Sequence, residues 1–263
     1  RVSRGLGDVY KRQVMAFHYR DRLINLLDTP GHKDFAEDTY RTLTAVDSVI
    51  LVVDCVKGVG AQTQRLMKVC RMRNTPVIIF INKMDLEGQD PFDLLDELEE
   101  KLQIQVRPLS WPISGGHSFK GVYSLYEKEL RLFNPDKTKI AKEVVSIADI
   151  ADPGLDELVT SEHAEQLRSD VELIEGVYEP WDAAPYLEGQ LAPVFFGSAV
   201  NNFGIQEMLD TFIDIAPDPR PRSTDVREVA PTESQFTGFI FKIHANIDPC
   251  LLYTSDAADD TCC

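Results

Sequence analysis

The stretch Val77-Ile78-Ile79-Phe80-Ile81-Asn82-Lys83-Met84-Asp85 decides the fold. Its apolar half is typical of a strand buried on both faces of a sheet, and its polar half begins where that strand ends. Two similar apolar runs, Val49–Val53 and Val194–Phe196, precede and follow it in the sequence. Because helical patterns separate these runs, the sequence predicts an α/β fold with a mostly parallel sheet flanked by helices.

The helical patterns are read from apolar residues spaced three and four apart. One helix is predicted around Leu66, Val69 and Cys70, and a second around Ile205, Met208, Leu209 and Phe212, ending before Pro217. A third should begin after Asp90, which can cap it, with Pro91 in the first position. Its buried stripe is Leu94, Leu95, Leu98 and Leu102. Near the start of the chain, Val14–Arg20 and Leu23–Leu27 predict a β-hairpin that turns at Asp21-Arg22.

Polar motifs follow three of the predicted strands. The carboxyl ends of the strands form the edge at which a parallel sheet binds ligands. The motifs are Asp28-Thr29-Pro30-Gly31-His32, Asn82-Lys83-Met84-Asp85 and Gly197-Ser198-Ala199. A carboxylate at Asp85 can accept both N–H donors of the Watson–Crick edge of guanine, where adenine presents the opposite polarity. Asn82 can tie neighbouring loops together and offer its amide to a base, and the stem of Lys83 can lie across a purine face.

The first and third motifs predict complementary contacts. Asp28, at the end of a strand, can hold Mg²⁺ through water, and Gly31 lets a backbone N–H approach a phosphate oxygen. His32 could then orient a water molecule for in-line attack. Ala199, in a tight turn after Ser198, could donate its backbone N–H to the guanine carbonyl oxygen. Each motif alone also fits a strand followed by an ordinary turn, so the interpretation depends on their shared position.

Taken in this order, the motifs resemble the third, fourth and fifth signatures of the GTPase superfamily. The motif Asp28–His32, with histidine last, is similar to that of the translational GTPases. The stretch Asp34–Asp47 resembles the bacterial class II peptide-chain release factors, the release factor 3 family, more than elongation factor G. The same likeness extends to Trp111–Ile113, Phe119–Tyr123 and Phe236–Ile243.

The resemblance implies a P-loop GTPase-type fold, with GTP or GDP and Mg²⁺ as cofactors. It implies His32 as the catalytic, water-positioning residue and Asp28 as the metal-binding residue. The nucleotide would be held by Asp28, Thr29, Pro30, Gly31, His32, Asn82, Lys83, Asp85, Ser198 and Ala199. The implied partners are the ribosome and a class I peptide release factor, whose departure after termination the enzyme would promote. Contact with ribosomal RNA is implied by the resemblance only.

Two other functions stay open from the sequence. One is an elongation-factor-G-like or ribosomal-protection GTPase. The other is a non-catalytic interaction module that binds no nucleotide and docks on a partner through its acidic segment. Membrane proteins are excluded by the lack of an apolar run near the ~20 residues needed to cross a bilayer. Only Cys55 and Cys70 lie in the body of the chain, which fits the reducing cytoplasm.

The predicted core, residues 14–85 and 191–216, is interrupted by a segment too long for an ordinary connection. Residues 86–190 carry 23 acidic against 9 basic side chains, so most of the net charge of -16 lies in this predicted α+β insertion. Such a charge disfavours RNA contact there. Residues 217–235 have the composition of a linker. Residues 236–249 would then supply the first strand of a second domain, a β-barrel.

Both ends of the chain look foreign to the protein. Asp8–Gln13 can be encoded by DNA whose reverse complement, in a shifted frame, encodes Cys250–Ser255. We therefore expect residues 1–13 and 250–263 to be translated sequencing adapter, the alternative being two genuine disordered tails. The phosphate loop G-x-x-x-x-G-K-[ST] is absent from the chain, so we expect the chain as written to bind GTP weakly or not at all and not to hydrolyse it.

Overall fold

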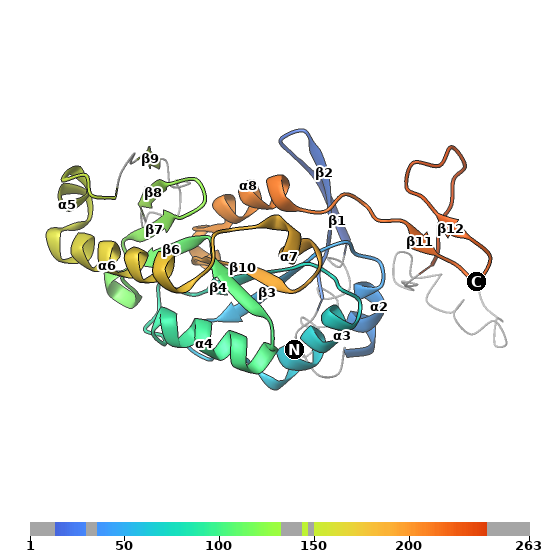
Figure 1. The fold of residues 1–263 in the computed structure, drawn as a ribbon, viewed down its shortest axis with the longest axis horizontal. Coiled ribbons are helices and arrows are strands. Elements are labelled where there is room, and N and C mark those ends of the chain that lie inside the picture. Colours follow the sequence, from blue (N-terminus) through green and yellow to red (C-terminus); the bar gives the residue numbers. More distant parts are fainter. Residues whose placement is uncertain (1–13, 30–35, 133–143, 147–149, 241–263) are drawn as a thin grey trace, which may run out of the picture. The chain divides into compact units, whose positions relative to one another are not determined.

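The computed structural model describes residues 14–29, 36–132, 144–146 and 150–240. The chain divides into two compact units, one formed by residues 47–218 and the other by residues 1–46 with 219–263. The larger unit holds a four-stranded parallel sheet in the order β3-β4-β10-β5 (Figure 1). Its strands are β3 (Val49–Asp54), β4 (Val77–Asn82), β10 (Leu191–Phe196) and β5 (Gln105–Pro108). The α/β fold predicted from the alternating pattern is confirmed.

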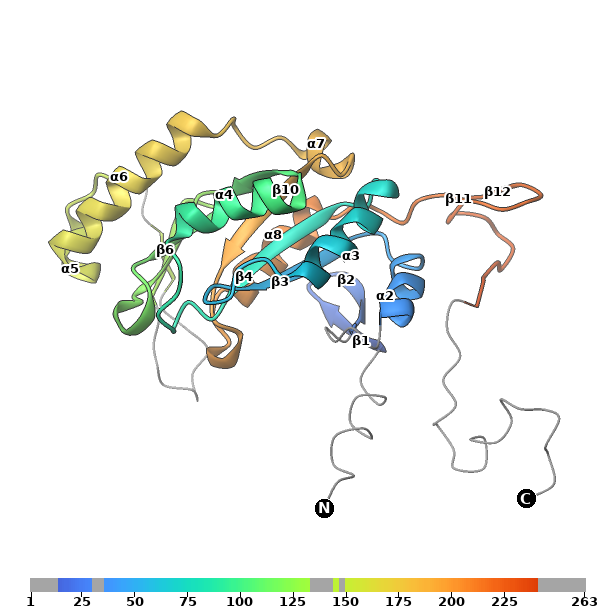
Figure 2. The ribbon, with the colours of Figure 1, turned by 90° about the horizontal axis from the view of Figure 1, so that it is seen from below.

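Helices cover both faces of this sheet. Figures 1 and 2 show α3 (Ala61–Met72) and α4 (Pro91–Leu102) on one face and α7 (Ala183–Leu187) and α8 (Ile205–Ile215) on the other. The start of α4 is as predicted, because the Asp90 carboxylate accepts a hydrogen bond from the backbone N–H of Phe92. The four leucines of its predicted stripe are all buried.

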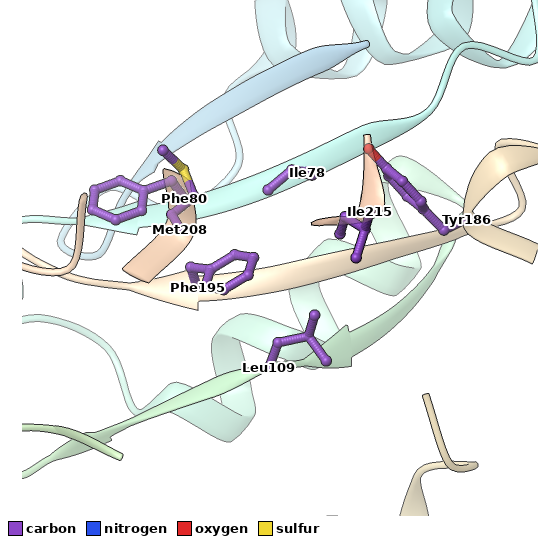
Figure 3. Close-up of a cluster of buried hydrophobic side chains, with 7 residues drawn as sticks. All are labelled: Ile78, Phe80, Leu109, Tyr186, Phe195, Met208 and Ile215. Carbon is purple, nitrogen blue, oxygen red and sulfur yellow. The ribbon is translucent and has the colours of Figure 1, made fainter. Parts of the chain in front are cut away.

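One hydrophobic cluster packs between the sheet and the α7–α8 face (Figure 3). Its buried members are Ile78, Phe80, Leu109, Tyr186, Phe195, Met208 and Ile215. Burial on both faces is confirmed for β4 and β10, whose residues from Val77 to Ile81 and from Ala192 to Phe196 are all buried. The same prediction is wrong for β3, because Val52 is 58% exposed. The physical reason is that β3 ends the strand order of this unit, where the covering helices leave part of a face open.

An antiparallel sheet follows the main sheet in the same unit. It consists of β6 (Ser110–Ile113), β7 (Gly121–Ser124), β8 (Glu129–Leu132) and β9 (Val144–Ser146), in that order. The 3₁₀ turn η2 (Gly116–Ser118) joins β6 to β7, and the helices α5 (Gly154–Val159) and α6 (Ser161–Val177) follow β9. Trp111 on β6 is buried and donates its indole N–H to Asp170 on α6 at 2.9 Å.

The segment predicted as an insertion, residues 86–190, is therefore shared between two sheets. It supplies α4 and β5 to the main sheet before it forms the antiparallel one. β5 pairs with β10 in parallel, with Val106 opposite Ala192. The boundary of a separate inserted subdomain stays a prediction.

The smaller unit contains the predicted hairpin, formed by β1 (Val14–Tyr19) and β2 (Arg22–Leu27). Its turn falls at Arg20 and Asp21, one residue earlier than expected, and Arg20 adopts φ 50°. Helix α2 (Ala36–Leu43) belongs to the same unit.

Two differences from the sequence-based expectation lie in the second half of this unit. The predicted linker, residues 217–235, contains a short ribbon of β11 (Arg222–Ser223) and β12 (Glu228–Val229). Residues 236–240, where the sequence predicts the beginning of a strand in a second domain, form no strand in the structure, and the second domain itself stays a prediction. A strand forms only beside a neighbouring strand that takes its backbone hydrogen bonds. The side chain of Phe236 is fully exposed. Residues 241–249 lie outside the described part of the chain. None of the helices that the structure describes is both long enough and apolar enough to span a bilayer.

Candidate functional site

Two of the predicted motifs begin side by side at the carboxyl edge of the main sheet. β4 and β10 are parallel neighbours, with Ile81 opposite Phe196, so their following loops leave the sheet at the same level. The loops are also joined by their backbones. Gly197 N–H donates to the carbonyl of Ile81 at 2.9 Å, and Met84 N–H donates to the carbonyl of Gly197 at 3.1 Å. We call residues 82–85 the β4 loop and residues 197–201 the β10 loop.

Asn82 links these two loops through its side chain. Its amide oxygen accepts hydrogen bonds from the backbone N–H groups of Lys83 and Ala199, both at 2.8 Å. The predicted tie between neighbouring loops is thus present. The Ala199 N–H is already engaged, however, so a guanine carbonyl oxygen would have to share or displace this bond. The contacts of Asn82 and Ala199 with a base stay predictions.

Asp85 is oriented by a side chain from the opposite loop. Ser198 Oγ donates to Asp85 Oδ1 at 2.5 Å, and Asn201 Nδ2 donates to Ser198 Oγ at 2.8 Å. Ser198 is completely buried, whereas Asp85 is half-buried. A buried relay of this kind fixes the carboxylate plane while leaving acceptor capacity on both of its oxygens. The sequence predicted Ser198 as a nucleotide-binding residue in a tight turn, without a bond to Asp85, and no sequence pattern pointed to Asn201.

The β10 loop is tight because backbone atoms close in on Gly197. A Cβ atom at this position would lie 2.4 Å from the carbonyl oxygen of Phe203 and 2.7 Å from Cζ of Phe80. The turn is closed by two backbone bonds between Ser198 and Phe203, at 3.0 and 2.9 Å. Glycine before Ser198 is therefore a steric requirement of the site.

Lys83 adopts an unusual backbone conformation for a residue with a side chain, with φ 71°. Its ammonium group lies 2.6 Å from Asp54 Oδ2, at the end of β3, and its carbonyl accepts a hydrogen bond from Cys55 Sγ at 3.1 Å. Partial burial acts to raise the pKa of Asp54, but the hydrogen bonds from Lys83 and from the backbone of Val56 and Lys57 outweigh it and lower that pKa. The pKa of Lys83 is correspondingly raised by its hydrogen bond to Asp54.

Cys55 lies under the β4 loop and is 1% exposed. Burial, followed by the negative charges of Asp54 and Asp85, raises the pKa of its thiol to about 11. At neutral pH the group is therefore a protonated donor to the Lys83 carbonyl and a poor nucleophile.

The first predicted motif is described only in part. Asp28 and Thr29 follow β2, with Asp28 exposed and Thr29 half-buried. Pro30, Gly31 and His32 lie outside the described residues, so the predicted roles of Gly31 and His32 stay predictions. Asp28 and Thr29 belong to the smaller unit, whereas the β4 and β10 loops belong to the larger one. In the described ranges, no three His, Cys, Asp or Glu side chains are grouped so that they could hold a metal ion.

Comparisons with known proteins match most of the chain. A family model, the elongation factor Tu GTP-binding domain, matches residues 6–218, which include both loops. The match begins within the segment predicted to be adapter-derived. Among solved structures, the crystal structure of a protein from Thermus thermophilus matches with a TM-score of 0.58 and 22% sequence identity. The match covers 80% of this chain and 33% of that one, and at this identity it shows a shared fold alone.

Proposed function

Because the chain belongs to the family of the elongation factor Tu GTP-binding domain, a family of translational GTPases, we propose that its β4 and β10 loops bind the base of a guanine nucleotide. The observation that supports this most directly is the bond from Ser198 Oγ to Asp85. It holds a carboxylate at the ligand edge of a parallel sheet, where it can accept two parallel N–H donors.

The remaining groups of the two loops fit a purine. The N1–H and amino group of guanine would donate to Asp85, and the stem of Lys83 would lie against the face of the base. The N–H of Ala199, which now donates to Asn82, would turn toward the guanine carbonyl oxygen. This leaves Asn82 to offer its amide to the base. Adenine would place an acceptor at N1 against the Asp85 carboxylate, so the site should reject it.

Phosphate binding is the weaker part of the proposed site. The amino-acid sequence contains no G-x-x-x-x-G-K-[ST] loop to surround the β and γ phosphates. Asp28 would hold Mg²⁺ through water, and His32 would orient the attacking water molecule. We expect this chain to bind the base of GTP or GDP with low affinity and to lack hydrolytic activity.

The substitution Asp85→Asn tests base recognition directly. Xanthine carries a carbonyl where guanine carries an amino group, so an amide at position 85 matches xanthine and mismatches guanine. We expect the wild type to bind guanosine in preference to adenosine and xanthosine. The variant should lose about 10- to 100-fold in guanosine affinity and gain xanthosine binding, since an unmatched buried donor costs about 1–3 kcal/mol. Ligand-observed NMR titration with the three nucleosides measures this at low affinity.

A matched control is Asp96→Asn, which removes one carboxylate charge from the exposed face of α4. It should leave all three affinities unchanged. If the wild type fails to prefer guanosine, or if Asp85→Asn leaves the preference intact, these loops do not read guanine.

We further propose that the protein acts in the cytoplasm on the ribosome as a class II peptide-chain release factor, promoting departure of the class I release factor after peptide hydrolysis. Support comes from the likeness of Asp34–Asp47 and of Phe119–Tyr123 to that family. The test uses the natural gene, sequenced again together with its flanking codons by a method that adds no adapter DNA. Its product should speed dissociation of a labelled class I factor from post-termination ribosomes at least tenfold with GTP. Stimulated translocation without that effect would instead support the elongation-factor-G-like alternative.

A further inference from the structure

We propose that Asp54 is a positioning residue for the purine site, which holds the side chain of Lys83 beside the base before the ligand arrives. The proposal deepens the proposed function and rests on it. Asp54 lies outside the three motifs and is the last residue of β3, where it is paired in register with Asn82, the first residue of the β4 loop. The parallel sheet therefore places this carboxylate at the ligand edge.

Lys83 is held at two points by consecutive residues of β3 and the turn after it. Its ammonium lies 2.6 Å from Asp54 Oδ2, and its carbonyl accepts the thiol hydrogen of Cys55 at 3.1 Å. The backbone N–H of Cys55 also donates to the carbonyl of Asn82 at 3.0 Å. Both the side chain and the left-handed backbone of Lys83 are thus set by the 54–55 segment.

The Asp54 carboxylate is itself fixed by the turn that follows β3. Its second oxygen, Oδ1, accepts backbone N–H bonds from Val56 at 2.9 Å and Lys57 at 3.3 Å. Gly58, with φ +64°, completes the turn by donating to the Asp54 carbonyl at 2.8 Å. One oxygen therefore anchors the carboxylate to its own backbone, and the other is presented to the lysine.

The chain beyond Asp85 packs against the same turn. Gln89 N–H donates to the Cys55 carbonyl at 3.0 Å, and a Cβ atom on Gly88 would lie 2.7 Å from Cys55 Sγ. The turn is thus in contact with the chain both at Lys83 and beyond Asp85.

The ion pair between Lys83 and Asp54 affects the position of the Lys83 side chain more than it affects the stability of the protein. The Lys83 side chain is 46% exposed, and solvent screening leaves such a pair little effect on stability. A lysine stem that is already ordered, by contrast, loses less rotamer entropy when a base packs against it. With its ammonium bound to Asp54, Lys83 presents its methylene groups to the ligand rather than its charge.

Asp54→Asn tests this inference, because the amide oxygen can keep the backbone bonds while the charge that holds Lys83 is lost. We expect guanosine affinity to fall about fivefold, with an equal fall for GDP and an unchanged guanosine preference over adenosine. NMR titration of the purified chain with guanosine and GDP measures both. The matched control is Asp156→Asn, which removes a carboxylate from another 2.6 Å ion pair, with Arg168, and should change neither affinity.

The second variant, Lys83→Met, keeps an unbranched stem but has no ammonium to hold. It should lose the same factor, and the double variant should lose no more than either single one. Unchanged guanosine binding in Asp54→Asn or in Lys83→Met overturns the inference. The inference is also overturned if Asp54→Asn binds GDP more tightly while its guanosine affinity is unchanged. That result would mean that Asp54 acts only by repelling phosphate. If the wild type does not bind guanosine, the proposed function is overturned as well. If the wild type binds guanosine and both variants bind it with the same affinity, this inference alone is overturned.

Discussion

Gly197 has no space for a side chain, because the Phe203 carbonyl oxygen and Phe80 Cζ occupy the place that a Cβ atom would need. Gly197→Ala should therefore destabilise the protein by about 1–3 kcal/mol, as overpacking of a close contact does, and should displace the β10 loop. Urea unfolding followed by circular dichroism measures the free energy of unfolding. Gly115→Ala is the control, since a Cβ there meets nothing within 4 Å. Equal stability of the two variants would show that the turn yields without cost.

The Ser198–Asp85 bond shows what a single residue contributes beyond its motif. A serine in a turn is common, and the sequence assigned Ser198 no partner. In the structure its hydroxyl is hydrogen-bonded to Asn201 of its own loop and to Asp85 of the β4 loop. The carboxylate is thus aimed by a group that lies 113 positions away in the chain.

Helix α4 is the element that the sequence marks most clearly, by its capping residue, its first-position proline and its stripe of leucines. Asp90→Ala removes the side chain that accepts from Phe92 N–H and should lower the free energy of unfolding by about 1 kcal/mol. The same urea titration measures it. Asp96→Asn, on the exposed face of the helix, serves as the control and should stay within about 0.5 kcal/mol of wild type. A cap variant as stable as this control would mean that the packing of the leucine stripe alone fixes the helix start.

β5, the strand of the main sheet that the sequence did not predict, had no such signals. Gln105–Pro108 is short and ends in proline, and it holds a buried arginine, so neither alternation nor an apolar run marks it. Arg107 is tolerated because its guanidinium donates to the carbonyls of Ile174 and Tyr178, at the end of α6. Only the neighbouring β10 makes this segment a strand.

Across the larger unit, a buried ion cluster connects β8 to α8. Arg131 lies 3.3 Å from Glu207 and 3.8 Å from Asp210, and 2.9 Å from Glu127 and 3.5 Å from Glu129. Burial raises the pKa of Glu207, and the charges of Asp210 and Glu127 act in the same direction, while Arg131 opposes them. A raised folded-state pKa means that the folded protein binds this proton more tightly than the unfolded one. The contribution of Glu207 to stability therefore declines as pH rises through the raised value.

Glu207→Gln, which mimics the protonated side chain, isolates this effect. The unfolding free energy of the variant relative to wild type should increase between pH 5 and pH 8. Urea titrations at several pH values measure the difference. Asp156→Asn is the control: the hydrogen bond from Arg168 lowers the pKa of Asp156, so this carboxylate stays ionised above pH 5 and its variant should show no such trend. A difference that is flat or falls with pH would contradict the assigned shift.

Much of the fold followed from the sequence because the signals were local. The runs Val77–Ile81 and Val194–Phe196 are apolar throughout, which is what a strand covered by helices on both faces requires, and Asp90-Pro91 specifies a helix start by itself. The predicted grouping of Asn82, Asp85 and Ser198 also followed, since the carboxyl ends of parallel strands share one edge.

What the tertiary structure alone decided are the contacts between segments distant in the chain. The partner of Lys83, the donor to Asp85, the exposed face of β3 and the strand identity of Gln105–Pro108 depend on which segments become neighbours. A sequence lists the groups available for hydrogen bonding and burial. Their distances and angles exist only once separate strands have been brought into register.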